Sequence, residues 1–237
     1  MRINKYLAKC GIGSRRKCDE YISSGKIKVD GIIVTDYSFN VNESSYVQFN
    51  NKLINKLENI IYMLNKPRGY ICTKDDNLGR KIIYDLLPKK YDLFSIGRLD
   101  YDTTGILLLT NDGDLCYKLT HPKFKIEKKY YVFTDKKLSK IDLSDIKKGI
   151  KIDNDFMIAN IKFLEHINNG YFWDVILTEG KNREIKKIFK YFDIQVLNLH
   201  RYEFAGLKMN GLKEGKFRKI SKKDFSRVLV NKKNNKY

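Results

Sequence analysis

The chain has 237 residues, enough for one or two domains of ordinary size. Its 47 Lys and Arg residues outnumber its 28 Asp and Glu residues and give a net charge of +19, which favours a polyanionic partner such as nucleic acid. With 42% hydrophobic and 13% aromatic residues, the chain is too rich in apolar side chains to be disordered.

Local patterns exclude several other classes of protein. The longest strongly apolar run, residues 106–109, is far shorter than the roughly 20 residues of a membrane span. The N-terminal segment MRINKYLAKCGIGSRRK carries a charge every few positions, unlike a signal peptide. We therefore expect a cytoplasmic protein without a membrane partner. The cysteines and histidines are scattered along the chain, so the sequence indicates no metal site and no dense disulfide framework.

The first thirty residues predict two short helices. Apolar residues recur at helical spacing near the start of the chain, and a pair of glycines ends that helix. Ser14 is a suitable N-cap for a second helix that runs to about Ser24. The dipeptide Asp30-Gly31 between two apolar runs is typical of a hairpin with a type I′ turn.

A basic surface is predicted on these elements. Arg15, Arg16 and Lys17 fall in the first turn of the second helix, where the helix dipole disfavours cations. A basic helix end beside a hairpin that carries Lys26 and Lys28 suits contact with RNA phosphates. The alternative is a solvated basic face without a partner.

The segment LAKCGIGSRRKCDEYISSGKIKVDGIIVTD resembles the S-four-type RNA-binding domain, which has the same two helices, basic pair and hairpin. The resemblance covers about residues 2–48. The polar stretch 50–59 follows it, so we expect a small α/β RNA-binding domain over residues 1–58 and a second domain over residues 59–237.

The second half of the chain predicts an α+β domain with a mostly antiparallel mixed sheet. In the segment YFWDVILTEG, Trp173, Val175 and Leu177 form one face of a central strand, with the intervening residues on the other. The expected strands lie near residues 60–65, 70–73, 93–96, 106–110, 127–134, 156–164, 171–178 and 194–204, and the expected helices near residues 80–86, 112–120, 139–147 and 182–192.

The segment FSIGRLDYDTTGILLLTNDGDL places Asp100 on a loop directly before a buried strand. A carboxylate held against the end of a central strand is well placed for chemistry. Two alternatives remain from the residues alone. Asp100 and Asp102 could be turn formers that cap nearby amides, or they could share a Mg²⁺ ion.

This segment resembles the signature of the RsuA/RluB-type pseudouridine synthases, in which a G-R-L-D loop carries the nucleophilic aspartate. Four further segments agree with that family in order and spacing, and they are LNKPRGYICT (64–73), EKKYYV (127–132), EGKNREIKKIF (179–189) and VLNLHRYEFAGLKMNGLKEGKFRKIS (196–221). The third of these carries lysines where arginine is frequent, which preserves the charge but not the forked geometry.

The resemblance implies that Asp100 is the nucleophile or base that opens the glycosidic bond. It implies that Tyr130 is the active-site tyrosine and that Lys186 pairs with the aspartate. The alternative for Tyr130 is a structural role, and the alternative for Lys186 is an ordinary surface lysine. The substrate-binding residues that we expect around them are Arg98, Leu99, Thr103, Arg183 and Ile185. We also expect two cations of the first motif, Lys66 and Arg68, to contact RNA.

The implied reaction is the isomerisation of uridine to pseudouridine in ribosomal RNA, with base flipping and without a cofactor. We expect large-subunit 23S RNA, free or in a pre-ribosomal particle, to be the partner of a monomeric enzyme. The alternatives are small-subunit 16S RNA as substrate, a non-catalytic RNA-binding or ribosome-assembly protein, and a Mg²⁺-dependent phosphoryl-transfer enzyme. The basic residues beyond Ser221 are expected to form a mobile tail.

Overall fold

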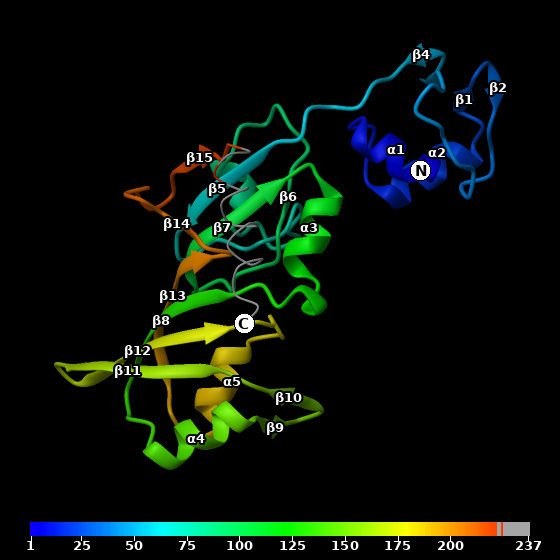
Figure 1. Ribbon diagram of the computed structural model, residues 1–237. Helices are drawn as coiled ribbons and strands as arrows, with labels where there is room; N and C mark the ends of the chain where they lie inside the picture. Colours follow the sequence, from blue (N-terminus) through cyan, green and yellow to red (C-terminus); the bar gives the residue numbers. More distant parts are fainter. Residues whose placement is uncertain (222–223, 225–237) are drawn as a thin grey trace. The chain divides into compact units, whose positions relative to one another are not determined.

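The computed structural model describes residues 1–221 and residue 224, and the chain forms two compact units (Figure 1). The first unit comprises Met1–Ile60 together with the short segment Lys89–Leu93. The second comprises Ile61–Pro88 and the chain from Phe94 onward. The predicted basic tail beyond Ser221 lies outside the described residues, apart from Asp224.

The first unit packs two helices against a small antiparallel sheet. The helices are α1 (Ile3–Lys9) and α2 (Arg15–Ser23), and the strands are β1 (Ile27–Val29), β2 (Ile32–Ile33), β3 (Val47–Phe49) and β4 (Lys52–Leu53), in the order β2-β1-β3-β4. Ser14 caps α2 as predicted, because its side chain accepts a hydrogen bond from the Lys17 amide at 3.2 Å. Ile3, Leu7 and Ile22 are fully buried and join the helices to the sheet.

The predicted hairpin of the first unit is present between β1 and β2. Asp30 and Gly31 both have positive φ, at 51° and 84°, as the two central residues of a type I′ turn require. Asp30 also accepts a hydrogen bond from the Tyr46 amide at 2.8 Å. This contact ties the turn to the chain that leads into β3, a strand that the sequence pattern did not predict.

The second unit contains a nine-stranded mixed sheet. Its main path is β11-β12-β8-β13-β7-β5-β15, while β6 pairs with β7 and β14 pairs with β13. The bounds are β5 (Ile61–Lys66), β6 (Phe94–Ser95), β7 (Thr104–Thr110), β8 (Lys128–Thr134), β11 (Asn160–Ile167), β12 (Gly170–Leu177), β13 (Val196–Phe204), β14 (Leu207–Lys208) and β15 (Phe217–Lys219). Strands β13 and β7 run parallel, whereas every other pairing among the described strands of this sheet is antiparallel. The predicted α+β class is therefore confirmed.

Helices and a small hairpin complete the second unit. The helices are α3 (Gly113–Thr120), α4 (Lys140–Lys148) and α5 (Glu184–Tyr191), the 3₁₀ turns are η1 (Ile83–Leu86) and η2 (Pro122–Phe124), and the hairpin joins β9 (Ile150–Ile152) to β10 (Asp155–Met157). Helices α4 and α5 lie beside the strands at one end of the large sheet (Figure 1). Strands β5 and β7 supply buried aliphatic side chains to a core that α3 also joins through Leu119.

Strand β12 shows the alternation that its sequence predicts. Trp173, Val175 and Leu177 are all buried. The Trp173 indole donates a hydrogen bond to Thr134 Oγ1 on β8 at 2.8 Å, so the polar atom of this buried side chain is satisfied. The buried face of β12 therefore fixes which side chains of neighbouring β8 face the interior.

Three expected elements differ in the structure. Residues 70–73 form no strand, because their pairing is limited to one bridge between Ile71 and Ile82. Residues 80–86 form the short 3₁₀ turn η1 rather than a longer helix. The single strand expected over 156–164 is two strands, β10 and β11, that belong to different sheets.

Candidate active site

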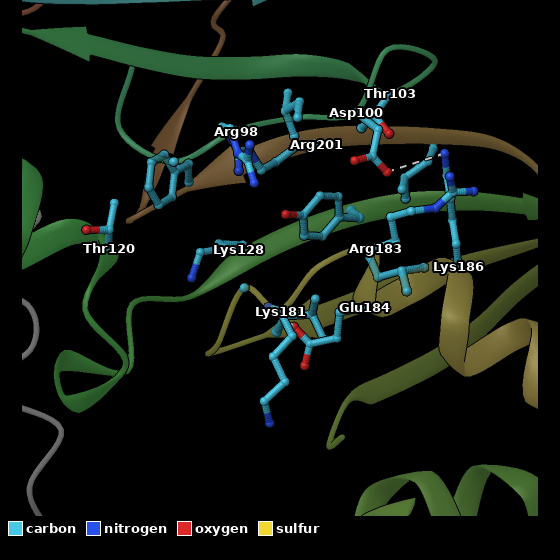
Figure 2. Close-up of a pocket in the computed structure, with 18 of the residues that line it drawn as sticks. Arg98, Asp100, Thr103, Thr120, Lys128, Lys181, Arg183, Glu184, Lys186 and Arg201 are labelled. Atoms are coloured by element: carbon cyan, nitrogen blue, oxygen red, sulfur yellow. Dashed lines mark hydrogen bonds and ion pairs between the residues drawn. The ribbon is translucent and has the colours of Figure 1, made fainter. Parts of the chain in front are cut away.

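A cavity of about 160 Å³ opens in the second unit, between the large sheet and the start of α5 (Figure 2). The eight residues predicted to act in catalysis or substrate binding all line it, and they are Arg98, Leu99, Asp100, Thr103, Tyr130, Arg183, Ile185 and Lys186. They come from the loop before β7, from β8, and from α5 and its N-cap. The fold thus brings together residues up to 88 positions apart in the sequence, the separation of Arg98 and Lys186.

Lys66, the last residue of β5, holds the loop that carries Asp100 in place. The Lys66 ammonium donates hydrogen bonds to the carbonyl oxygens of Thr103 at 2.9 Å, Pro67 at 3.0 Å and Tyr101 at 3.4 Å. The Lys66 side chain is fully buried, and this burial holds the pKa of its ammonium below the ordinary value. The expectation that Lys66 contacts RNA is therefore wrong, because the loop carbonyls occupy its ammonium away from the surface.

Cys72 holds the same loop at a second point. Its thiol donates to the Leu99 carbonyl at 3.3 Å, and the Leu99 amide donates back to the sulfur at 3.4 Å. Burial raises the pKa of the Cys72 thiol, so the neutral form that this reciprocal contact needs is favoured. Leu99 is itself buried at the cavity wall, directly before Asp100.

Lys186 approaches the Asp100 carboxylate from α5, as Figure 2 shows. Its ammonium lies 3.5 Å from Asp100 Oδ2 and 2.5 Å from Asp102 Oδ1. The helix is anchored by the buried side chains of Ile185 and Ile188, which turn the Lys186 side chain towards the loop. The predicted approach of Lys186 to the aspartate is present, and Asp102 is a second partner that the sequence did not indicate.

Two carboxylates thus share one ammonium. Burial by itself raises the pKa of Asp102, but the hydrogen bond and the charge of Lys186, with the Arg183 charge, outweigh it, so the pKa lies below the ordinary value. The Mg²⁺ alternative placed a cation between Asp100 and Asp102, and here the lysine ammonium lies within ion-pair distance of both carboxylates. Among the described residues, no cluster of three or more His, Cys, Asp or Glu side chains has a metal-binding arrangement.

Tyr130 lies on β8 and is 7% exposed at the cavity wall. Strand register places it opposite Arg201 of β13, whose guanidinium carbon lies 6.0 Å from the centre of the Tyr130 ring. Arg201 also lines the cavity and was not among the predicted site residues. Its position within the last of the five matched segments, 196–221, is the signal that could have pointed to Arg201, whereas the pairing with Tyr130 depends on how β13 and β8 meet.

The remaining substrate-binding candidates surround these groups. Arg98 is exposed at the cavity mouth, and Arg183 is exposed at the N-cap of α5, with a φ of 52°. Thr103 is 2% exposed, and its hydroxyl has no hydrogen-bond partner among the described residues. Glu184, a wall residue that the sequence did not indicate, is 4% exposed and accepts a hydrogen bond from the Lys181 amide at 3.0 Å.

The RNA-binding candidates of the first unit lie on its surface. Arg15 and Arg16 are exposed in the first turn of α2, while Lys17 pairs with Glu20 at 2.6 Å. Lys26 is exposed, with its ammonium 5.4 Å from the centre of the Tyr21 ring, and the side chain of Lys28 is half-buried. In the second unit, Arg68 is exposed and donates to Asn198 Oδ1 at 3.5 Å.

Comparison with known proteins identifies the family of the chain. The family described as RNA pseudouridylate synthase matches residues 60–191, and the S4 domain family matches residues 1–45. The chain is 34% identical to the ribosomal large subunit pseudouridine synthase B of Bacillus subtilis over 96% of this chain and 95% of that protein. It is 36% identical to an uncharacterized RNA pseudouridine synthase of Rickettsia typhi over 98% of this chain and 96% of that protein.

A solved structure gives the same result. A crystal structure of a pseudouridylate synthase, 27% identical, superposes with a TM-score of 0.68 over 96% of this chain and 99% of that chain. The matches to the S4 domain family at the N-terminus and to the synthase family after it assign the chain to a class of RNA-modifying enzymes. The chain belongs to the RNA pseudouridylate synthase family. Membership confirms the family predicted from the five motifs.

No helix in the part of the chain that the structure describes has the length and apolar character needed to cross a bilayer.

Proposed function

We propose that this protein isomerises a uridine of large-subunit ribosomal RNA to pseudouridine, with Asp100 as the nucleophile or base. The observation that carries the proposal is the arrangement of Asp100, Lys186 and Tyr130 around one small cavity. Large-subunit RNA is the substrate named for the Bacillus subtilis relative, which this chain matches along nearly its whole length.

The reaction explains why so few residues are needed. The bond between ribose C1′ and uracil N1 breaks, the ring turns, and a new bond forms between C1′ and C5. The proton on C5 leaves, and N1 gains one. Atoms and electrons are thus only rearranged, so the proposed reaction needs neither a redox cofactor nor a second substrate.

Asp100 is suited to open the glycosidic bond. A carboxylate must be charged to act as a nucleophile or base, and an ammonium 3.5 Å away stabilises that charge and restrains its orientation. The hydrogen bonds from Lys66 to the loop carbonyls, and from Cys72 to Leu99, keep the loop backbone in one position. Such positioning lowers the entropy cost of reaching the reactive geometry.

Tyr130 has two features that suit the same reaction. Its ring can stack on a uracil, and its hydroxyl can take part in the transfer of the C5 proton. Because β12 and β13 pair with β8 on either side, the backbone that carries the ring is held in place before the substrate arrives.

The cavity can hold a single base only after that base has left its helix. Extrusion costs a few kcal/mol, which contacts to the flanking nucleotides must offset. Arg98 and Arg183 are exposed at the cavity and are placed for flanking phosphates, since a guanidinium forms forked hydrogen bonds with phosphate oxygens. Arg15 and Arg16 of α2 are placed to contact RNA further from the reaction.

One copy of the chain supplies every residue of the proposed site, so we propose that a monomer is active. We propose that it acts in the cytoplasm, on free ribosomal RNA or on a pre-ribosomal particle. Small-subunit RNA remains the alternative substrate, and non-catalytic RNA binding remains the alternative function.

The experiment is to map pseudouridine in both ribosomal RNAs from a strain that lacks this protein. We expect one or more uridines of the large-subunit RNA to be unmodified, and expression of the wild-type protein to restore them while Asp100→Asn does not. Loss of pseudouridine from the small-subunit RNA alone would assign the other substrate. Unchanged modification in both RNAs would contradict the enzyme function.

A further inference from the structure

Arg201 is a buried cation at the cavity wall, and one of its hydrogen-bond donors is unpaired among the described residues (Figure 2). Its side chain is 2% exposed, and its Nε donates to the Ile106 carbonyl at 2.7 Å. Its Nη2 is buried and has no hydrogen-bond partner among the described residues. A guanidinium has only donors, so Nη2 can be satisfied only by an acceptor.

The position of Arg201 is closely restrained. On one side, strand register pairs it with Gly105 of β7, whose φ is +106°. A Cβ atom at position 105 would lie 2.2 Å from the Arg201 carbonyl oxygen, so the two strands approach as closely as only glycine allows. On the other side, the guanidinium carbon lies 4.7 Å from the centre of the Phe204 ring and 6.0 Å from that of Tyr130.

Leaving a buried donor unpaired costs free energy, and this cost is removed when a ligand supplies the acceptor. The environment of Arg201 selects the kind of acceptor. Arg98 and Arg183 are exposed, as suits phosphate groups at the surface, whereas Arg201 lies between aromatic rings inside the cavity. A neutral carbonyl of an aromatic base fits this interior position better than a hydrated phosphate does.

We propose that Arg201 donates a hydrogen bond through Nη2 to a carbonyl oxygen of the extruded uracil and keeps this bond available while the ring turns. The proposal rests on the proposed function and assigns the specificity of the same site. Because Nη2 has no free surface in the empty cavity, the entering base displaces the neighbouring side chains slightly as it binds.

The symmetry of uracil makes one fixed donor sufficient. Turning the ring by half a revolution about the N3–C6 axis exchanges N1 with C5, as the reaction requires, and it also exchanges the two carbonyl groups at C2 and C4. A donor that faces one carbonyl before the turn therefore faces the other afterwards. Arg201 holds the base in both orientations without moving.

The same symmetry excludes cytosine. Cytosine carries an amino group at C4, which is a donor, so one of its two orientations places donor against donor. Since the arginine cannot become an acceptor, cytosine loses the hydrogen bond either before or after the turn. Arg201 is thus a specificity-determining residue as well as a substrate-binding one.

The test replaces the uracil oxygens with sulfur, which is a much weaker acceptor. A short RNA that contains the mapped target uridine is prepared with uridine, 2-thiouridine or 4-thiouridine at that position, and conversion is followed in single turnovers. We expect wild type to convert both thio substrates about tenfold more slowly than uridine. Both positions matter because each oxygen faces Arg201 in one of the two orientations.

Arg201→Met keeps an unbranched apolar side chain of about the length of the arginine stem but removes its donors. We expect it to convert uridine more slowly and to lose the preference for oxygen over sulfur, so that the three substrates differ by less than about twofold. Arg201→Lys retains a charged donor and should keep part of the preference. If Arg201→Met does not fold, the comparison of Arg201→Lys with wild type decides the proposal, because an unchanged preference would overturn it.

Lys128→Met is the matched control. Lys128 lines the same cavity, but its ammonium already donates to the carbonyl oxygens of Ile126 at 3.1 Å and Glu179 at 2.9 Å. This variant should keep the wild-type preference for oxygen whatever its rate. A full wild-type preference in Arg201→Met would show that Arg201 only supports the sheet, and wild type without a preference would also overturn the proposal. Failure of wild type to convert uridine would instead contradict the proposed function.

Discussion

The ammonium of Lys186 lies 2.5 Å from Asp102 Oδ1, closer than it lies to Asp100 Oδ2. The helix that carries the lysine is therefore tied to the loop through a carboxylate that is not the proposed nucleophile. This arrangement places a positive charge beside Asp100, while the shorter contact of the ammonium is with Asp102. The contact with Asp102 also makes the stability of the site depend on pH.

The first prediction concerns this dependence. The pKa of Asp102 is lowered from its ordinary 3.8, so its ion pair stabilises the fold at pH values above 3.8 and is lost as the pH falls through the lowered pKa. Because Asp102 is 52% exposed, solvent screening limits the effect. Asp102→Asn should lower the free energy of unfolding at pH 7 by at most about 1 kcal/mol. Urea unfolding at pH 7 and pH 3 measures the difference in the free energy of unfolding between Asp102→Asn and wild type. This difference should be smaller at pH 3 than at pH 7, and a larger difference at pH 3 would contradict the account.

A second prediction concerns Lys66. Replacing it by methionine leaves three carbonyl oxygens of the loop and strand end without their shared donor. We expect Lys66→Met to lower the free energy of unfolding by about 2–4 kcal/mol and to reduce conversion as the loop loosens. Lys118→Met, at an exposed position on α3, is the control and should change stability by less than about 0.5 kcal/mol. Equal stabilities for the two variants would show that Lys66 does not hold the loop.

A third prediction separates hydrogen bonding from size at Cys72. Serine keeps a donor and an acceptor at this position, whereas alanine keeps neither. Cys72→Ser should therefore retain most of the conversion rate, and Cys72→Ala should lose about tenfold because Leu99 and the neighbouring nucleophile are less restrained. Single-turnover conversion with both variants checks this expectation. Equal rates for serine and alanine would mean that the contact with Leu99 does not position the loop.

A fourth prediction concerns RNA binding by the first unit. Arg15 and Arg16 are exposed in the first turn of α2, so replacing both by alanine should weaken RNA binding and reduce the slope of log affinity against log salt by about 2. Filter binding at several salt concentrations measures the slope. The exposed Lys140 and Lys147 of α4 provide a double-alanine control of equal charge, and a slope that falls equally in both double variants would show a general charge effect instead.

Short-range patterns were enough to predict much of the fold. The dipeptide Asp30-Gly31 predicted its turn because few residues tolerate positive φ at both positions. The alternation around Trp173 predicted the buried face of β12, because one face of a strand packs inside and the other does not. Strand β3 was not predicted, since three residues are too few for a periodic pattern and it is held by distant partners.

The order of the motifs was enough to predict which segments form the site. The contacts between their side chains could not be predicted in this way. Nothing near Lys66 in the sequence signals that a loop more than thirty residues away supplies carbonyls to bury its ammonium. As a cation of the first motif, Lys66 was therefore expected to contact RNA together with Arg68. The sharing of Lys186 with Asp102 and the unpaired donor of Arg201 likewise depend on how separate strands and helices meet, which local pattern does not encode.

The central claim is that Asp100 performs chemistry on a uridine of large-subunit ribosomal RNA. The most direct measurement is single-turnover formation of pseudouridine in unmodified large-subunit RNA, with wild type and Asp100→Asn compared at equal RNA occupancy. The account predicts conversion of a specific uridine by wild type and a rate below about one thousandth of it for the variant, whose RNA affinity is retained. Equal conversion by the two proteins would contradict it, as would the absence of conversion by wild type on this RNA.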